Sequence, residues 1–65
     1  MREKAVIKRA AGNGAGTVRI QVIRQSDGEV LGSIIYNPSS TASCEAMEMK
    51  LAAIQGRYNL ELELD

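Results

Sequence analysis

The stretch 11–17 reads Ala-Gly-Asn-Gly-Ala-Gly-Thr, and a glycine-rich loop of this kind can bind phosphate through its backbone N–H groups. The phosphate-binding motifs G-x-x-x-x-G-K-[ST] and G-x-G-x-x-G occur between a strand and a helix. Neither motif is present, the loop has no lysine, and the pattern after it is that of a strand. We interpret the stretch as a flexible hairpin connection and keep Gly14 as a candidate anion contact.

Residues suited to catalysis or metal binding are scarce. The chain has no histidine, which removes the most common general base and the Ser-His and Cys-His nucleophile pairs. Its one cysteine, Cys44, cannot form a zinc site alone, and its place on the apolar stripe of a predicted helix favours a structural role. Glu61, Glu63 and Asp65 lie about 7 Å apart along a predicted strand, too far to share one ion. We therefore expect a protein that is not an enzyme and needs no metal or cofactor.

Positive charge gathers in the first third of the chain, although the net charge is zero. The candidate contacts to an anion or a nucleic acid are Lys8, Arg9, Gly14, Arg19 and Arg24. Sheets that bind single strands usually stack bases on aromatic rings, and this chain has only Tyr36 and Tyr58. A dimeric β-ribbon that reads duplex DNA needs fewer rings. Nucleic-acid binding through the basic first third is therefore our second hypothesis.

Three strands are predicted in the first half, at 4–10, 17–25 and 30–36, where β-branched residues and period-2 alternation dominate. Asp27-Gly28 predicts a hairpin turn between the last two. A two-residue loop would pair Ile20 with Ile35, whereas a three-residue loop with Gly28 left-handed would pair it with Ile34. We favour the second register, because it places one apolar set on a single face: Val18, Ile20, Val22, Val30, Ile34 and Tyr36.

A helix and a fourth strand complete the predicted fold. Pro38 and the hydroxyl residues after it stop the third strand and start a helix over 41–55, with Gly56 expected as its left-handed C-cap. The helix has an apolar stripe of Cys44, Met47, Leu51 and Ile54. Residues 58–65 alternate as a strand, expected parallel to the first and lying beside it or pairing with a second subunit.

The predicted fold is a single α+β domain over 1–65, in the order β-β-β-α-β. It is a largely antiparallel sheet of three or four strands with one helix packed on one face. One short helix cannot cover both faces, and the second face is expected to expose Ile23, Leu31 and Ile35. Met49 falls off the helix stripe and is a further candidate contact. We therefore predict a small non-catalytic module that acts through protein contacts as a homodimer.

Location and partners follow from what the chain lacks. One cysteine allows no internal disulfide, which fits a reducing cytoplasm. Lys8 and Arg9 interrupt the chain before any apolar run of signal-peptide length, and no run is long enough for a membrane span. We expect a cytoplasmic protein with a second copy of itself as partner, and without a membrane or a small-molecule substrate.

Overall fold

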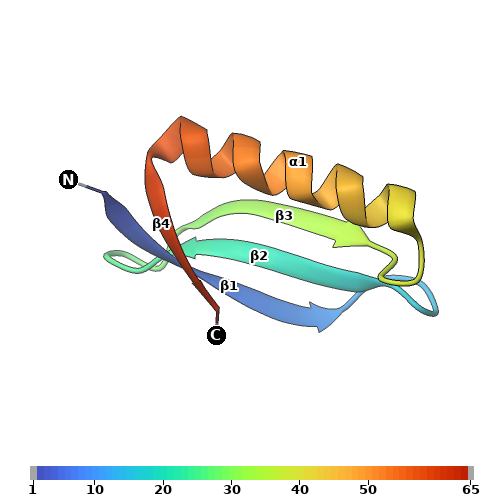
Figure 1. Cartoon of the computed structure of the whole chain (residues 1–65). Helices are drawn as coiled ribbons and strands as arrows, with labels where there is room; N and C mark the ends of the chain where they lie inside the picture. The colour runs from blue at the N-terminus through green and yellow to red at the C-terminus, as the bar shows by residue number, and fades with distance from the viewer. Residues whose placement is uncertain (1, 65) are drawn as a thin grey trace.

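A four-stranded mixed sheet carries one helix on one of its faces (Figure 1). The computed structural model describes residues 2–64. Its elements are β1 (Glu3–Ala11), β2 (Val18–Arg24), β3 (Val30–Tyr36), α1 (Thr41–Tyr58) and β4 (Leu60–Leu64). The strand order is β3-β2-β1-β4, in which β4 is parallel to β1 and the other neighbours are antiparallel. The predicted α+β fold is confirmed, and the fourth strand pairs with the first within the chain.

The hairpin between β2 and β3 has the favoured register. Gly28 has a left-handed φ of 75°, its N–H donates to the Arg24 carbonyl at 2.8 Å, and Ile20 pairs with Ile34. A β-bulge then interrupts the pairing of β2 with β3. Val22 pairs with Gly32 but Ile23 pairs with Val30, so β3 has one extra residue at this point. The positions of Val30 and Leu31 after this bulge differ from the prediction.

The bulge exchanges the faces of those two residues. Val30 pairs with Ile23 on the face away from the helix and is 49% exposed. Leu31 packs against the buried cluster of Ala5, Val22 and Leu60 on the helix side. The prediction that Val30 belongs to the core and Leu31 to the second face was therefore wrong, because strict alternation does not continue through a bulge.

The helix is longer than predicted at its C-terminal end. Ser40 is the N-cap, and its hydroxyl accepts a hydrogen bond from the Ser43 N–H at 3.3 Å. The helix continues through Gly56 to Tyr58, and Asn59 is the left-handed C-cap with a φ of 52°. The predicted end at Gln55 with a Gly56 cap was wrong. Tyr58 packs against the core in its helical position, so the chain reverses only after it.

The core lies between α1 and the sheet, and its buried members are Ala5, Ile7, Ile20, Val22, Ile34, Tyr36 and Leu60. The predicted helix stripe packs against them from above, through Cys44, Met47, Leu51 and Ile54. Gly32 on β3 lies directly below Ile54, where a Cβ would overlap the end of that side chain. Within residues 2–64, no helix combines the length and the apolar composition needed to cross a membrane.

Candidate interaction surfaces

The sheet face that α1 does not cover, called the open face here, carries an apolar row across three strands. Val6 on β1 pairs with Ile23 on β2, which pairs with Val30 on β3. Four residues further along β1, Ala10 pairs with Arg19 on β2. Arg19 in turn pairs with Ile35 on β3, which is 46% exposed. A polar row of Lys8, Gln21 and Ser33 separates them. The open face is thus half apolar, and the described residues, 2–64, place no second layer on it.

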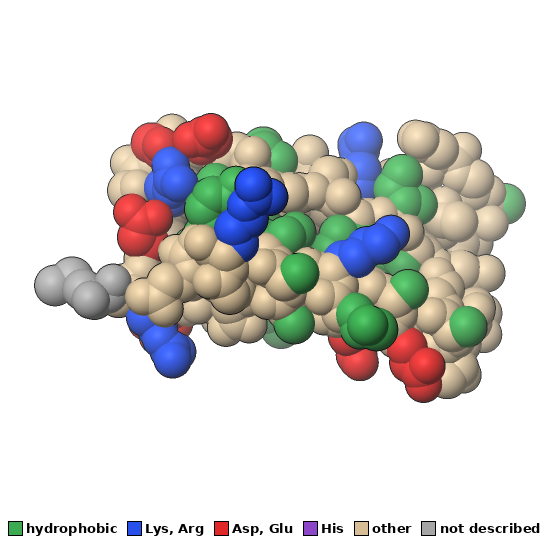
Figure 2. Space-filling model, turned by 90° about the horizontal axis from the view of Figure 1, so that it is seen from above, with side chains coloured by type: hydrophobic (Ala, Val, Ile, Leu, Met, Phe, Trp, Pro, Cys, Tyr) green, Lys and Arg blue, Asp and Glu red, His purple; other side chains and the backbone are tan. Residues whose placement is uncertain are grey.

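The four predicted interface residues do not form one surface. Ile23 and Ile35 share the open face, as predicted, whereas Leu31 packs on the helix side. Met49 is 74% exposed and lies on the solvent side of α1, with the sheet between it and Ile23. Figure 2 views that side, and it shows separate hydrophobic side chains among acidic and basic ones. Val30 lies on the open face in place of Leu31. The bulge causes this exchange, and the alternation of apolar and polar residues in the sequence does not predict the bulge.

The five predicted anion contacts are also divided. Lys8 and Arg19 point from neighbouring strands onto the open face, because Lys8 pairs with Gln21 and Arg19 is two residues from Gln21 on β2. Arg9 lies on the other face, where its Nη2 donates to the Tyr36 hydroxyl at 3.2 Å. Only Lys8 and Arg19 therefore form a shared basic surface.

Arg24 belongs to an ion-pair network at the start of β1 and the β2–β3 turn. Its guanidinium contacts the carboxylates of Glu3 at 3.1 Å, Asp27 at 3.1 Å and Glu29 at 3.0 Å. The hydrogen bond to Asp27 raises the pKa of Arg24, and the surrounding negative charges raise it further. The Glu29 N–H, which donates to Asp27 Oδ1 at 3.1 Å, lowers the pKa of Asp27 together with Arg24. Arg24 thus holds the turn together, and its charge is balanced locally.

The glycine loop is a hairpin connection between β1 and β2, as predicted. The Gly12 N–H donates to the Thr17 carbonyl at 3.0 Å, and Gly16 takes a left-handed φ of 76°. Thr17 fastens the loop, since its hydroxyl donates to the Gly14 carbonyl at 2.6 Å and accepts from the Gly14 N–H at 3.1 Å. The backbone N–H of Gly14, the candidate anion contact, is therefore already hydrogen-bonded inside the loop.

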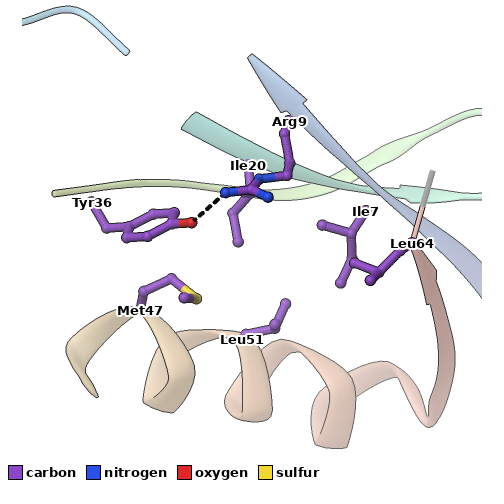
Figure 3. Close-up of a pocket in the computed structure, with 7 residues that line it drawn as sticks. All are labelled: Ile7, Arg9, Ile20, Tyr36, Met47, Leu51 and Leu64. Atoms are coloured by element: carbon purple, nitrogen blue, oxygen red, sulfur yellow. Dashed lines mark hydrogen bonds between the residues drawn. The ribbon is translucent and has the colours of Figure 1, made fainter. Parts of the chain in front are cut away.

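A small cleft opens between α1 and one corner of the sheet, and we call it the corner cleft (Figure 3). It has a volume of about 200 Å³. The cleft is lined by the apolar side chains of Ile7, Ile20, Met47, Leu51 and Leu64, together with Arg9 and Tyr36. Leu64, at the end of β4, is 81% exposed.

The corner cleft exists because the two neighbouring strands differ in length. β4 pairs with β1 only from Glu3 to Ile7, whereas β1 continues to Ala11. Within residues 2–64, the helix side of the sheet therefore has no fourth strand beneath α1 beyond Ile7. Sequence reasoning missed this cleft, because it depends on where the pairing of β4 stops, and the alternation in β4 does not encode that point.

The remaining reactive groups form no further site. Cys44 is a free thiol that packs against the core cluster and donates to the Pro38 carbonyl at 3.6 Å. In the part of the chain that the structure describes, no group of three cysteine or carboxylate side chains is placed to hold a metal ion. Comparison of the chain with protein-family models, with curated proteins and with solved structures found no match.

Proposed function

We propose that this chain is a small non-catalytic module that acts through protein contacts, and that it forms a homodimer through its open face. The observation that carries this proposal is the apolar row of Val6, Ile23 and Val30, with Ile35 nearby, on a sheet face that has no second layer. An exposed apolar face of a sheet is stabilised when a second layer packs on it and removes it from water. A two-fold dimer provides that layer with the same surface on both copies.

The amount of exposed surface supports an uncovered face. The chain exposes 4464 Å², whereas a compact monomer of its mass of 7.0 kDa is expected to expose about 4000 Å². A domain of this size without disulfides also gains stability from association, because its own core is small. Burial of the four exposed or half-buried aliphatic side chains would add to that core in each copy.

We place the two-fold axis of the dimer parallel to the strands and centred on β2, so that the apolar rows of the two copies face each other. It places Val6 over Val30 of the other copy, Ile23 over its own counterpart, and Ala10 over Ile35. β4 with its glutamates remains outside this overlap, on the side of the sheet away from β3. In this arrangement Arg19, in the middle strand, faces its counterpart of like charge. Replacing Arg19 by Gln should therefore strengthen the dimer, by a factor of about two to five.

Two matched variants test the proposed interface. Ile23→Lys places a charge in the centre of the apolar row and should shift the chain to a monomer in light scattering. Met49→Lys makes a similar change at an exposed site on the helix, and should leave the dimer intact. Val30→Lys, at a position already 49% exposed, serves if Ile23→Lys unfolds. Equal association of all three variants and the unmodified chain would contradict the proposed interface.

Nucleic-acid binding is the second candidate, and the placement of Lys8 beside Arg19 on the open face is what favours it. In residues 2–64 neither side chain takes part in an ion pair. The same face cannot serve the dimer and a nucleic acid together, so the two proposals are alternatives. Titration with mixed-sequence DNA and RNA at low salt decides, since phosphate contacts must weaken as salt rises. Absence of binding at low salt removes this candidate.

We place this activity in the cytoplasm. The support is the free thiol of Cys44, which persists in a reducing compartment and forms no disulfide within the chain. A cell fractionation of the tagged chain tests this location.

A further inference from the structure

β1 is paired on both sides over only part of its length. All residues of β1 from Ala5 to Ala11 pair with β2 on one side. On the other side only Glu3 to Ile7 pair with β4, so the edge from Lys8 to Ala11 is open in the part of the chain that the structure describes. An open strand edge presents free backbone donors and acceptors, and an added strand can satisfy them.

β4 shows which side chains suit a strand that pairs with this edge of β1. Its sequence alternates Leu-Glu-Leu-Glu-Leu, with leucines on the helix side and glutamates on the open face. Leu60 is only 1% exposed beneath α1, whereas Lys4 on β1 forms an ion pair with Glu63 at 3.9 Å. A strand beside β1 thus places its aliphatic side chains under the helix and its carboxylates near Lys4.

The same two features continue past the end of β4. On the helix side the corner cleft offers about 200 Å³ between Ile7, Leu51 and Leu64 (Figure 3). An apolar cavity of about 150 Å³ is enough to bind a benzene-sized group. The corner cleft is therefore large enough for one aliphatic or aromatic side chain.

On the open face, Lys8 lies four residues beyond Lys4 along β1, two periods of the strand alternation further, and forms no ion pair within residues 2–64. Arg9 adds a second positive charge in the lining of the cleft, held in place by the Tyr36 hydroxyl. The free edge thus combines backbone groups, an apolar cleft and two cations. Each is complementary to one part of an extended acidic peptide.

We propose that an extended peptide segment of a partner protein, with alternating aliphatic and acidic residues, adds as a strand to β1 along Lys8–Ala11. One aliphatic side chain enters the corner cleft, and the flanking carboxylates lie beside Lys8. The cleft is on the helix side of the sheet, and the added strand would lie on the β4 side of β1, which the proposed overlap of β1, β2 and β3 leaves uncovered, although Lys8 itself faces that overlap. The peptide site therefore goes beyond the proposed function, and a dimer is not needed for it.

The experiment uses a fluorescein-labelled peptide, Ser-Glu-Leu-Glu-Leu-Ser, titrated with the intact chain and followed by fluorescence anisotropy. We expect saturable binding. A control peptide with both leucines replaced by serine keeps the charge and should bind at least about tenfold more weakly, because nothing then fills the cleft. Equal binding of the two peptides, or no binding of the leucine peptide, overturns the proposal.

Protein variants locate the peptide. Leu64→Glu puts a carboxylate at the mouth of the cleft and should weaken binding by about tenfold. Met49→Glu makes the same kind of change at a comparably exposed position on the outer side of α1 and should change the affinity by less than about twofold. Lys8→Gln should weaken binding by about threefold, whereas Lys50→Gln on the helix should not. Equal effects in either pair overturn the assignment to this edge.

Strand addition has its own signature in hydrogen exchange. The bound peptide should slow amide exchange within Lys8–Ala11 by at least about tenfold, with little change at the opposite edge strand β3. Binding without protection at Lys8–Ala11 overturns strand addition. Sedimentation of the same samples reports the dimer independently, so a monomer that binds the peptide removes the proposed function and leaves this site in place.

Discussion

The contacts of Arg24 illustrate how single residues position the open face. Arg24 joins the start of β1 to the β2–β3 turn through Glu3, Asp27 and Glu29. Ile23, the centre of the apolar row, precedes Arg24 directly in the chain. The network therefore holds one end of the candidate interface, and its strength depends on the ionisation of carboxylates.

Asp27 gives this network a pH dependence. The pKa of the folded carboxylate lies below its ordinary value of 3.8, through the Glu29 N–H and Arg24. A lowered pKa stabilises the folded state above pH 3.8, and this contribution is lost as the pH falls from there through the folded pKa. Asp27→Asn should therefore flatten the loss of unfolding free energy between neutral pH and pH 3, measured by urea denaturation. An unchanged slope in the variant would show that Asp27 does not contribute.

Gly32 is a residue whose role only the structure reveals. It lies in the middle of β3, where glycine is normally unfavourable, but a methyl group there would overlap Ile54 Cδ1. The missing side chain lets α1 approach the sheet closely.

We expect Gly32→Ala to lower the free energy of unfolding by about 1–3 kcal/mol through overpacking. Ile54→Val removes the overlapping Cδ1 and should cost about 0.5–1.5 kcal/mol alone. Because it also makes room for the new methyl group, the double variant should be less destabilised than the sum of the two. Denaturation of the four proteins measures this coupling, and strict additivity would rule out the contact.

At the scale of elements, local patterns located every strand and the helix, and failed where tertiary contacts decide. The alternation in 17–25 and the Asp27-Gly28 turn predicted the pairing of Ile20 with Ile34. The bulge beside Val22 and the shortness of β4 carry no such pattern, because they depend on packing across the sheet. These two features place Val30 on the open face and create the corner cleft, so the candidate sites were less predictable than the fold.

The end of α1 provides a prediction at this scale. Gly56 lies inside the helix without a positive φ, and a Cβ there would meet no atom within 4 Å. Gly56→Ala should therefore stabilise the protein by about 0.5–1 kcal/mol, since glycine costs that much in a helix interior. Asn59→Ala, at the left-handed cap, should cost about 1–2 kcal/mol. Thermal unfolding distinguishes them, and destabilisation by Gly56→Ala would mean that the helix ends earlier.

At the scale of the whole molecule, one layer of helix covers one side of a four-stranded sheet (Figure 1). The other side remains half apolar. The length and the single cysteine of the chain indicated that association would help stability. The structure identifies a surface suited to it and separates this surface from Met49 and the corner cleft. The proposed function therefore depends on whether two copies of the chain associate through the open face.

Sedimentation equilibrium of the unmodified chain at micromolar concentrations tests this central claim most directly. For a dimer formed through the open face, we expect an average mass that rises with concentration toward twice 7.0 kDa. Ile23→Lys, measured in parallel, should remain at the monomer mass while Met49→Lys follows the unmodified chain. A mass of 7.0 kDa at every concentration for the unmodified chain would contradict the dimer and leave the open face to another partner.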